Sequence, residues 1–226
     1  MARHTIVPIV EGHGEVEAVP ILLRQWFKFR RFWNFVTPDL AVRAHQGSLI
    51  CAHDPDREQG IECYVVRAAA KRPDGILVIL DADDICIERR GRPTHEQLGP
   101  ELLRRARSAI AHVPLGVVVV NREFEAWYLA AYRRLKRRGH FHKDVRFEGG
   151  FDVERPRDCK GRVSEYIGRK YSPTADQKIL AQEIGFGPYM ARYSPSFGKL
   201  LRDLERIAHE ARQANRARRR AAHHRD

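Results

Sequence analysis

The sequence IVPIVEGHGE at residues 6–15 places an acidic, glycine-containing turn directly after an apolar run. A second stretch, ILVILDADD at residues 76–84, repeats this arrangement with aspartates after the apolar residues. Continuous apolar, β-branched runs are typical of strands that are covered on both faces. A carboxylate at the end of such a strand lies at the carboxyl edge of a parallel sheet, where open α/β sheets bind ligands. The two stretches therefore predict an α/β fold with an acidic pocket at one edge of its sheet.

The pattern around these two stretches predicts strands that alternate with helices. We expect strands at residues 4–10, 40–45, 76–80 and 115–120, and helices at residues 15–29, 56–72, 100–112 and 123–138. Pro20 would fall early in its helix, where a first turn tolerates proline. This order predicts a mostly parallel, four-stranded sheet with helices on both faces.

The pattern changes after about residue 140. Residues 140–160 are polar and predict a long loop, and short helices are expected at residues 160–170, 174–184 and 196–214. The arginine-rich end of the chain predicts a frayed helix or a disordered tail. We expect an α/β core at 1–139, a loop and helical C-terminal extension of the same domain at 140–211, and a basic tail at 212–226.

The composition indicates a polyanionic partner. The chain has 226 residues, with 41 Lys and Arg against 29 Asp and Glu, and a formal net charge of +12. Nucleic acid is the first partner to expect, although a solubilising charge bias explains the same excess. No apolar stretch is long enough for a transmembrane helix, so we expect no membrane partner. The four cysteines show no C-x-x-C spacing, and with no signal peptide apparent we expect free thiols in the cytoplasm.

The first acidic turn has two interpretations. Glu11 and Glu15 flank it, and a lone acid at this position is often only a helix cap or a partner of the helix dipole. The turn glycines allow a tight turn and the close approach of a ligand to the backbone. A dinucleotide fingerprint is incomplete because Glu17 occupies the position of its third glycine, and no P-loop motif is present. His13 is either a general acid or an ordinary hydrogen-bonding histidine.

The second acidic turn points to a divalent cation. Asp81 and Asp83 can converge on one ion, while Asp84 caps the following segment, and a solvated acidic turn is the alternative. After the fourth strand, Glu123 and Glu125 either complete the coordination shell or simply favour the N-terminus of a helix. Carboxylate oxygens are the ligands that Mg²⁺ and Mn²⁺ prefer, so we expect one of these ions as cofactor.

Basic residues provide candidate phosphate contacts. Lys160 lies in the predicted loop and could fold back over the site to stabilise a phosphate, or could be an ordinary surface lysine. A basic cluster on the predicted fourth helix suits nucleic-acid binding, or forms a solvated face: Arg133, Arg134, Lys136, Arg137 and Arg138. A second arginine-rich run at residues 216–220 has the same two interpretations.

Five short blocks together resemble a known family. They are VEGHGE at 10–15, LDADD at 80–84, REFEAW at 122–127, YSPTADQ at 171–177 and SPSF at 194–197. This combination resembles the Toprim-like family catalogued as domain of unknown function 4276, over roughly residues 5–205. Toprim folds are shared by topoisomerases, primases and nucleases related to the overcoming-lysogenisation-defect protein.

The resemblance implies specific site residues and partners. It implies a divalent metal held by Glu11, Asp81 and Asp83, with Glu15 matching the second acid of the nuclease-like branch. No Ser-Asp pair follows the fourth strand as in the better-studied nucleases, which leaves a second metal open. Family members often lie beside genes for ABC-type ATPases of defence systems, which implies an ATPase as a candidate partner. Toprim nucleases often act as dimers, which implies a homodimer.

Two functions of different classes follow from these observations. The first is a metal-dependent phosphodiesterase, a nuclease acting on DNA or RNA, in which basic residues hold the nucleic-acid backbone. Its one or two metal ions would be bound by Glu11, Asp81 and Asp83, helped by Glu15 and by one of Glu123 and Glu125. The second is a non-catalytic Toprim-like subunit that binds nucleic acid and regulates an ABC-type ATPase. Strand passage or nucleotidyl transfer is a weaker third option, because the chain lacks the additional domains that such enzymes need.

Overall fold

The structure, a computed structural model, describes residues 3–82, 95–144, 152–155 and 158–223. The predicted metal ligand Asp83, its neighbour Asp84 and most of the predicted loop at 85–99 lie outside the described residues. The strands are β1 (His4–Val10), β2 (Phe35–Val36), β3 (Val42–Arg43), β4 (Gly75–Asp81) and β5 (Leu115–Val120). The helices are α1 (Glu15–Phe29), α2 (Ile61–Ala69), α4 (His95–Ala109), α5 (Ala126–Ala130), α6 (Tyr132–Arg137), α7 (Cys159–Ile167), α8 (Pro173–Glu183), α9 (Pro188–Tyr193) and α10 (Pro195–His223).

The strands form one parallel sheet that is four strands wide. Its order is β2-β1-β4-β5, and β3 also pairs with β1. The two short strands share one edge, because β2 pairs with the start of β1 and β3 with its end. Pro38 lies between them and has no N–H for the ladder, which is consistent with the interruption. The predicted α/β class is therefore confirmed, whereas the strand predicted at 40–45 is only two residues long and β2 was not predicted.

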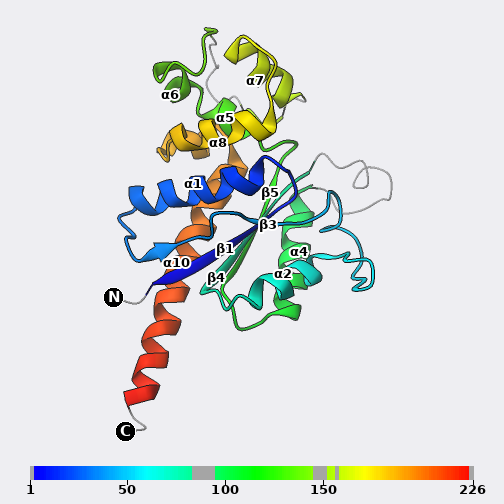
Figure 1. Cartoon of the computed structure of the whole chain (residues 1–226), viewed down its shortest axis with the longest axis vertical. Coiled ribbons are helices and arrows are strands. Elements are labelled where there is room, and N and C mark those ends of the chain that lie inside the picture. The colour runs from blue at the N-terminus through cyan, green and yellow to red at the C-terminus, as the bar shows by residue number, and fades with distance from the viewer. Residues whose placement is uncertain (1–2, 83–94, 145–151, 156–157, 224–226) are drawn as a thin grey trace.

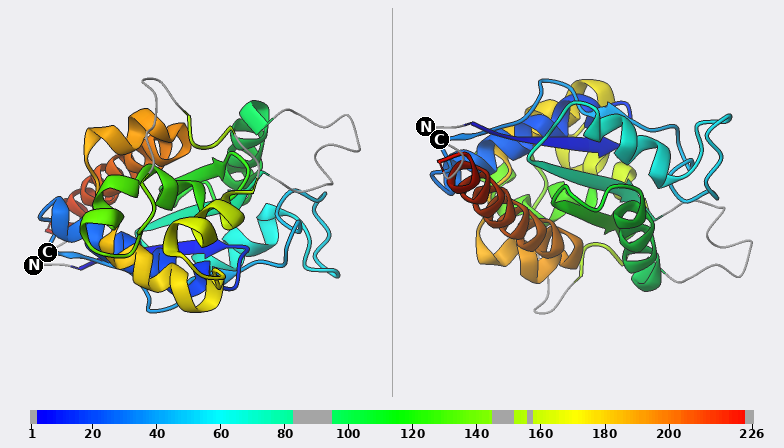
Figure 2. Two further views of the ribbon diagram at one scale, coloured as in Figure 1. Left: turned by 90° about the horizontal axis from the view of Figure 1, so that it is seen from above. Right: turned by 90° about the horizontal axis from the view of Figure 1, so that it is seen from below.

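Helices cover both faces of the sheet, as Figure 2 shows from above and below. Alternate strand residues point to opposite faces. One core contains Ile6, Leu77 and Val118 together with apolar residues of α1 and of the helices after β5. The other contains Val7, Val78 and Val117 together with residues of α2 and α4. All of these strand positions are buried, which explains why the strand sequences are continuously apolar.

Pro20 is the sixth residue of α1, and so lies beyond the first turn in which it was expected. A proline inside a helix cannot donate to the carbonyl four residues earlier. Here that carbonyl belongs to Val16, and it accepts a hydrogen bond from the backbone N–H of Ala41 at 2.9 Å. The carbonyl that Pro20 leaves free is thus satisfied by the segment just before β3, and the proline helps to tie α1 to the edge of the sheet.

Several helix boundaries differ from the sequence-based expectation. The helix predicted from residue 56 starts at Ile61, because an antiparallel bridge between Asp54 and Gln59 and a positive φ of 92° at Gly60 precede it. The helix predicted from Pro100 already begins at His95. The single helix predicted at 123–138 is divided into α5 and α6, with Ala131 outside helical geometry.

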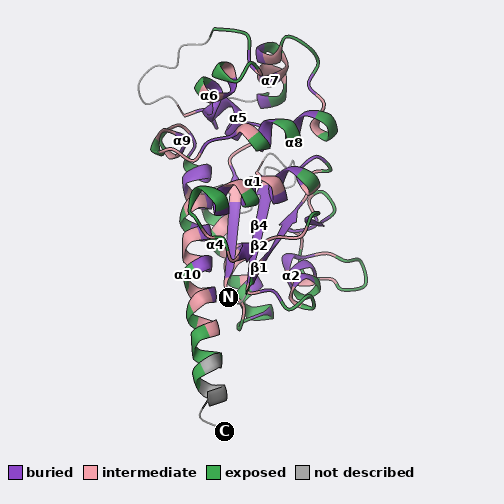
Figure 3. Ribbon diagram, turned by 60° about the vertical axis from the view of Figure 1, so that its left-hand side comes forward, coloured by how far each residue is buried: buried purple, intermediate pink, exposed green. Residues whose placement is uncertain are grey.

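The helices after β5 gather above the carboxyl edge of the sheet, at the top of Figure 1. There α8 packs along α1, and α5 contacts α7 and α9. In contrast, α10 runs back across the sheet against β5 and β4 and continues past the sheet toward the C-terminus (Figure 1). It remains helical to His223, so residues 212–223 extend this helix. Its first half carries buried residues, whereas the described side chains between 212 and 220 are intermediate or exposed (Figure 3).

The described residues bear on two further expectations. Within them, no helix combines the length and apolar character that crossing a bilayer requires. The cysteines at 51, 63 and 159 are not joined in disulfide bonds, and Cys86 lies outside the described residues.

Candidate functional site

A cavity of about 420 Å³ opens at the carboxyl edge of the sheet, beneath the helices that cover this edge. Its walls come from the turn after β1, from β3 and the residue that ends β4, from the segment after β5, and from α7 and α8. The lining residues are Glu11, Gly12, His13, Gly14, Glu15, Arg43, Gln46, Asp81, Glu123, Glu125, Lys160, Pro173, Thr174 and Gln177. The structure therefore brings Glu11, Glu15, Asp81, Glu123, Glu125 and Lys160 to one cavity.

Glu11 is held at the sheet edge by two neighbouring segments. Its Oε1 accepts a hydrogen bond from the backbone N–H of Gly47 at 3.0 Å. Its carbonyl oxygen accepts a longer bond, 3.4 Å, from Nε of Arg43 on β3. The first contact fixes one carboxylate oxygen of Glu11, and the second places a guanidinium on the wall of the cavity.

Glu15 is the first residue of α1 and is only 5% exposed. Its Oε2 accepts from the backbone N–H of Gly12 at 3.3 Å. A Cβ at position 12 would lie 2.4 Å from Oε1 of Glu15, and a Cβ at Gly14 would lie 2.5 Å from the carbonyl oxygen of Pro173. The glycines were expected to admit a ligand. In this structure both glycines line the cavity, and they also leave room for the Glu15 side chain and the N-terminus of α8.

Asp81 ends β4 directly beside Val120, the last residue of β5. Its Oδ1 is buried and accepts no hydrogen bond from the described residues. A buried carboxylate oxygen without a partner is costly. Burial raises the pKa of Asp81 well above its usual range, the charges of Glu15 and Glu125 raise it further, and Lys160 opposes them.

Glu125 is the most buried acid of the cavity, with 1% exposure. Its Oε1 accepts from Nε2 of Gln177 on α8 at 3.1 Å. Its Oε2 and the hydroxyl of Tyr171 are both buried without a hydrogen-bond partner among the described residues. Burial raises the pKa of Glu125, and the charge of Lys160 partly offsets this effect. Burial and the charge of Glu125 also raise the pKa of the Tyr171 hydroxyl.

Lys160 provides the cationic side of the cavity. It lies in the first turn of α7, not in the loop predicted from the sequence; the N-cap of this helix, Asp158, accepts from the N–H of Gly161. Its Nζ is 3.2 Å from Oε1 of Glu123 and 4.0 Å from Oε2 of Glu125. Burial lowers the pKa of Lys160, but the charges of Glu125, Glu123 and Asp81 outweigh burial, so the pKa is raised overall.

Glu15 carries the pKa shift with the clearest consequence. Burial is the largest cause, the charge of Glu125 adds to it, and the Gly12 N–H opposes it; together they raise the pKa of Glu15 from 4.5 to about 7. A carboxyl with such a pKa exchanges its proton near neutral pH, which is the range that acid–base chemistry requires.

The donor chemistry of the cavity fits a hard divalent cation. All of its acidic donors are oxygens, and Asp81 and Glu125 each have a buried oxygen that a cation would satisfy. The part of the chain that is described contains no group of three or more His, Cys, Asp or Glu side chains arranged to hold a metal ion. Asp83, the third ligand expected from the sequence, lies outside that part, so the metal centre remains a prediction.

The predicted nucleic-acid cluster at residues 133–138 does not line this cavity. It lies on α6 and its C-terminal end, and three members are engaged: Arg134 donates to the carbonyl of Glu183, Arg138 pairs with the Glu183 carboxylate, and Lys136 pairs with Asp144. Arg133 and Arg137 are exposed. The role of this cluster in nucleic-acid binding remains a prediction.

The sequence-based reasoning assigned no role to Arg43, Gln46, Gln177 and Tyr171, although the structure places the first three on the cavity wall. Gln177 and Tyr171 belong to the block at 171–177 that carried the family resemblance, so a signal for them was present. No sequence signal pointed to Arg43 and Gln46, because they reach the cavity only through the pairing of β3 with β1.

Comparison with protein families identifies a match over residues 10–205, to a model described as Domain of unknown function (DUF4276). The chain belongs to this family. The family resemblance seen in the sequence is thus confirmed. One similar solved structure is the C-terminal region of the Burkholderia pseudomallei OLD protein, with 13% identity and a TM-score of 0.43, covering 93% of this chain and 99% of that chain. A search of curated proteins gave no match.

Proposed function

We propose that this member of the DUF4276 family is a divalent-metal-dependent phosphodiesterase that cleaves DNA or RNA. The observation that carries the proposal is a pair of buried carboxylate oxygens, on Asp81 and Glu125, that accept no hydrogen bond from the described residues and share one cavity with a lysine. Burying several acids together is unfavourable unless protons or a cation neutralise them. Keeping this arrangement at a ligand-binding sheet edge is more readily explained by a reaction than by stability.

Glu11, Asp81, Glu125 and, outside the described residues, Asp83 are the groups proposed to hold Mg²⁺ or Mn²⁺. When bound, the ion would activate a water molecule and neutralise charge on the scissile phosphate. Glu15, with its pKa of about 7, is suited to accept or return a proton near neutral pH. Lys160 on α7 and Arg43 on β3, which both line the cavity, would orient the phosphate and balance its charge.

The alternative is a subunit that binds nucleic acid without turnover and regulates an ABC-type ATPase. Two hydrogen bonds favour this alternative: Glu11 accepts from the N–H of Gly47, and Glu125 accepts from Nε2 of Gln177. Both acids therefore join distant segments of the fold, which is a structural role. We prefer the enzyme, since within the described residues the second oxygen of Glu125 and Oδ1 of Asp81 accept no hydrogen bond. A homodimer and action in anti-phage defence remain part of the proposal.

The test is cleavage of plasmid DNA, single-stranded DNA and RNA by the purified chain with Mg²⁺, Mn²⁺ or EDTA. The site variant is Asp81→Asn, and the matched control is Asp39→Asn, an aspartate whose side chain is 96% exposed. Metal-dependent cutting that is lost in Asp81→Asn and kept in Asp39→Asn would support the enzyme. Equal cutting by both variants would refute the assignment of the site, and binding without cutting by the wild type would favour the regulatory subunit.

A further inference from the structure

A second hollow, about 700 Å³, lies between the C-terminal end of α1 and the middle of α10. Its lining is rich in aromatic and basic residues: Trp26, Phe29, Arg30, Phe32, Phe186, Leu201, Arg202, Glu205, Arg206, His209 and Arg212. We call this hollow the α1–α10 groove. None of its residues belongs to the acidic cavity, so it has no part in the chemistry proposed above.

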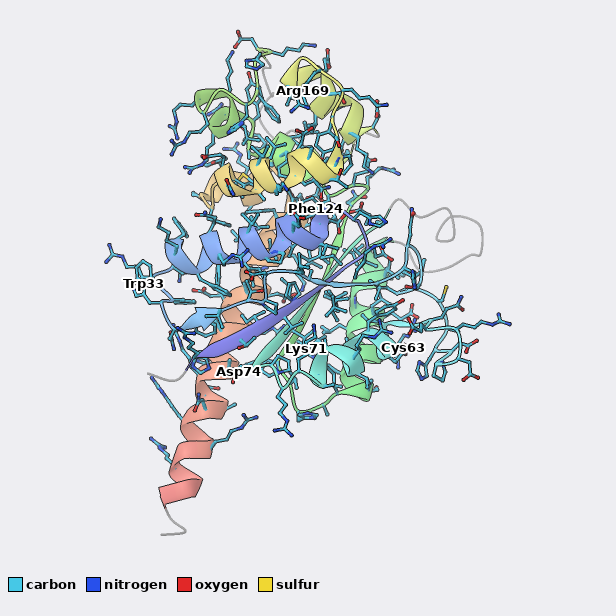
Figure 4. The ribbon with its side chains drawn as sticks, in the orientation of Figure 1. Trp33, Cys63, Lys71, Asp74, Phe124 and Arg169 are labelled. Atoms are coloured by element: carbon cyan, nitrogen blue, oxygen red, sulfur yellow. The ribbon has the colours of Figure 1, made fainter. Side chains whose placement is uncertain are left out.

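Aromatic rings are accessible in and beside the groove. Phe29 is 57% exposed and packs against Phe186, with ring centroids 5.6 Å apart. Trp33, in the turn after α1, is 73% exposed and lies at the outer edge of the molecule (Figure 4). Single exposed apolar side chains are ordinary, whereas several that gather at one place and are rimmed by polar residues mark an interaction site. Flat rings are well suited to stack on unpaired bases.

The arginines of the groove are not all used internally. Arg30 pairs with Glu205, and Arg206 is anchored to Glu210 and to the carbonyl of Leu115. Within the described residues, by contrast, no carboxylate pairs with Arg202 or Arg212. Arg212 lies over the ring of Phe32, with its Cζ 4.1 Å from the ring centroid. That contact holds the guanidinium in place and leaves its N–H groups for an anion.

We infer that the α1–α10 groove binds single-stranded nucleic acid, with phosphates on Arg202 and Arg212 and bases stacked on Phe29. Charge complementarity supports this occupant, because the groove carries an excess of arginine in a chain with a net charge of +12. An acidic protein segment would satisfy the arginines and leave the aromatic rings without a stacking partner. A duplex keeps its base faces covered, so only a single strand uses both kinds of residue.

The groove would act as a second contact for the nucleic acid substrate, and in this respect the inference rests on the proposed function. Trp26 follows Glu15 by eleven residues on α1, which corresponds to about 16 Å along the helix axis. About five nucleotides span this distance at 3.4 Å per nucleotide. A strand of modest length can therefore contact the groove and the acidic cavity at the same time.

The experiment measures binding of a fluorescein-labelled oligothymidylate of about 16 nucleotides by fluorescence anisotropy, in EDTA so that no cutting occurs. Phe29→Ala is compared with Leu40→Ala, since these apolar side chains are similarly exposed, at 57% and 56%. Arg202→Gln is compared with Arg107→Gln, an exposed arginine of α4 on the opposite face of the sheet. Each groove variant should weaken binding by about tenfold, and each control by less than twofold.

The salt dependence separates the two roles. Loss of one phosphate contact should reduce the slope of log Kd against log salt by about 0.7 in Arg202→Gln, whereas Phe29→Ala should weaken binding without changing the slope. A pre-annealed duplex should bind more weakly than the single strand. Unchanged affinity in both groove variants, or equal losses in the groove variants and their controls, would overturn the inference.

Oligonucleotide binding by Asp81→Asn tests whether the groove and the acidic cavity act separately. If this variant binds the oligonucleotide as the wild type does, the groove acts independently of the acidic cavity. A protein that binds through the groove but never cuts would refute the proposed enzyme and leave the inference intact. A protein that cuts nucleic acid while its groove variants bind as the wild type does would support the proposed enzyme and overturn the inference about the groove.

Discussion

Replacing Glu15 by Gln should stabilise the metal-free protein at alkaline pH. In the folded chain, burial raises the pKa of Glu15 from 4.5 to about 7. The folded state therefore binds this proton more tightly than the unfolded state does. The associated stability is fully present below pH 4.5, falls as the pH rises from 4.5 to about 7, and is lost above that range.

The size of the effect follows from the same shift. Each pKa unit corresponds to about 1.4 kcal/mol, so the rise from 4.5 to about 7 corresponds to about 3.5 kcal/mol. Glutamine stays neutral at every pH and can still accept the hydrogen bond from the N–H of Gly12. The free energy of unfolding of Glu15→Gln should exceed that of the wild type by up to about 3.5 kcal/mol at about pH 8.5, and by roughly 1 kcal/mol or less at about pH 5.

Urea unfolding followed by tryptophan fluorescence in EDTA measures both free energies. The control is Glu17→Gln, which removes a charge from the same first turn of α1 at a side chain that is 51% exposed. The difference between variant and wild type should grow with pH for Glu15→Gln only. A Glu15 variant that is less stable than the wild type at pH 8.5, or two variants with the same pH profile, would refute the burial argument.

Three further outcomes are expected. Mg²⁺ should raise the melting temperature of the wild type more at about pH 8.5 than at about pH 6, because the buried acids must lose protons to bind it; equal shifts would contradict this. Gly14→Ala should lower the free energy of unfolding, measured in urea, by about 1–3 kcal/mol. Its Cβ would lie 2.4 Å from Oε1 of Gln177 and 2.5 Å from the carbonyl oxygen of Pro173. Wild-type stability in this variant would show that α8 does not approach so closely. Glu154→Ala should lower the free energy of unfolding, measured thermally, by at least about 1–3 kcal/mol. The variant removes the buried acceptor of the Ser196 N–H and hydroxyl at the start of α10. An unchanged melting temperature would mean that water replaces this acceptor.

The long strands could be predicted from the sequence because they are covered on both faces of the sheet and therefore appear as continuous apolar runs. The apolar runs of β1, β4 and β5 lie within a residue or two of the predicted bounds. The two-residue strand β2 has no such signal, since it exists only through its pairing with β1. The start of α2 was also misplaced, because the preceding turn depends on the bridge between Asp54 and Gln59.

The acidic residues of the cavity could be predicted from the sequence, whereas its other lining residues could not. Parallel strands end at one edge, so acids that follow β1, β4 and β5 converge whatever else the chain does. Gln177 reaches Glu125 across 52 residues of sequence because α8 packs along α1. Such contacts depend on helix packing between distant segments, and no local pattern encodes them. The same holds for Arg43, whose place depends on an edge strand of two residues.

The charges of the cavity favour one divalent ion over two among the described residues. Five acids line it, namely Glu11, Glu15, Asp81, Glu123 and Glu125, against the two cations Arg43 and Lys160. With every acid ionised, the excess is three negative charges, which one Mg²⁺ reduces to one and two would reverse. Below about pH 7, Glu15 retains its proton and the excess is smaller still. A phosphate brings its own negative charge, however, so a second ion could enter together with the substrate. Titration calorimetry with Mg²⁺ alone should therefore yield a stoichiometry near one, and a value of two without substrate would show that acids outside the described residues, Asp83 first, add to the site.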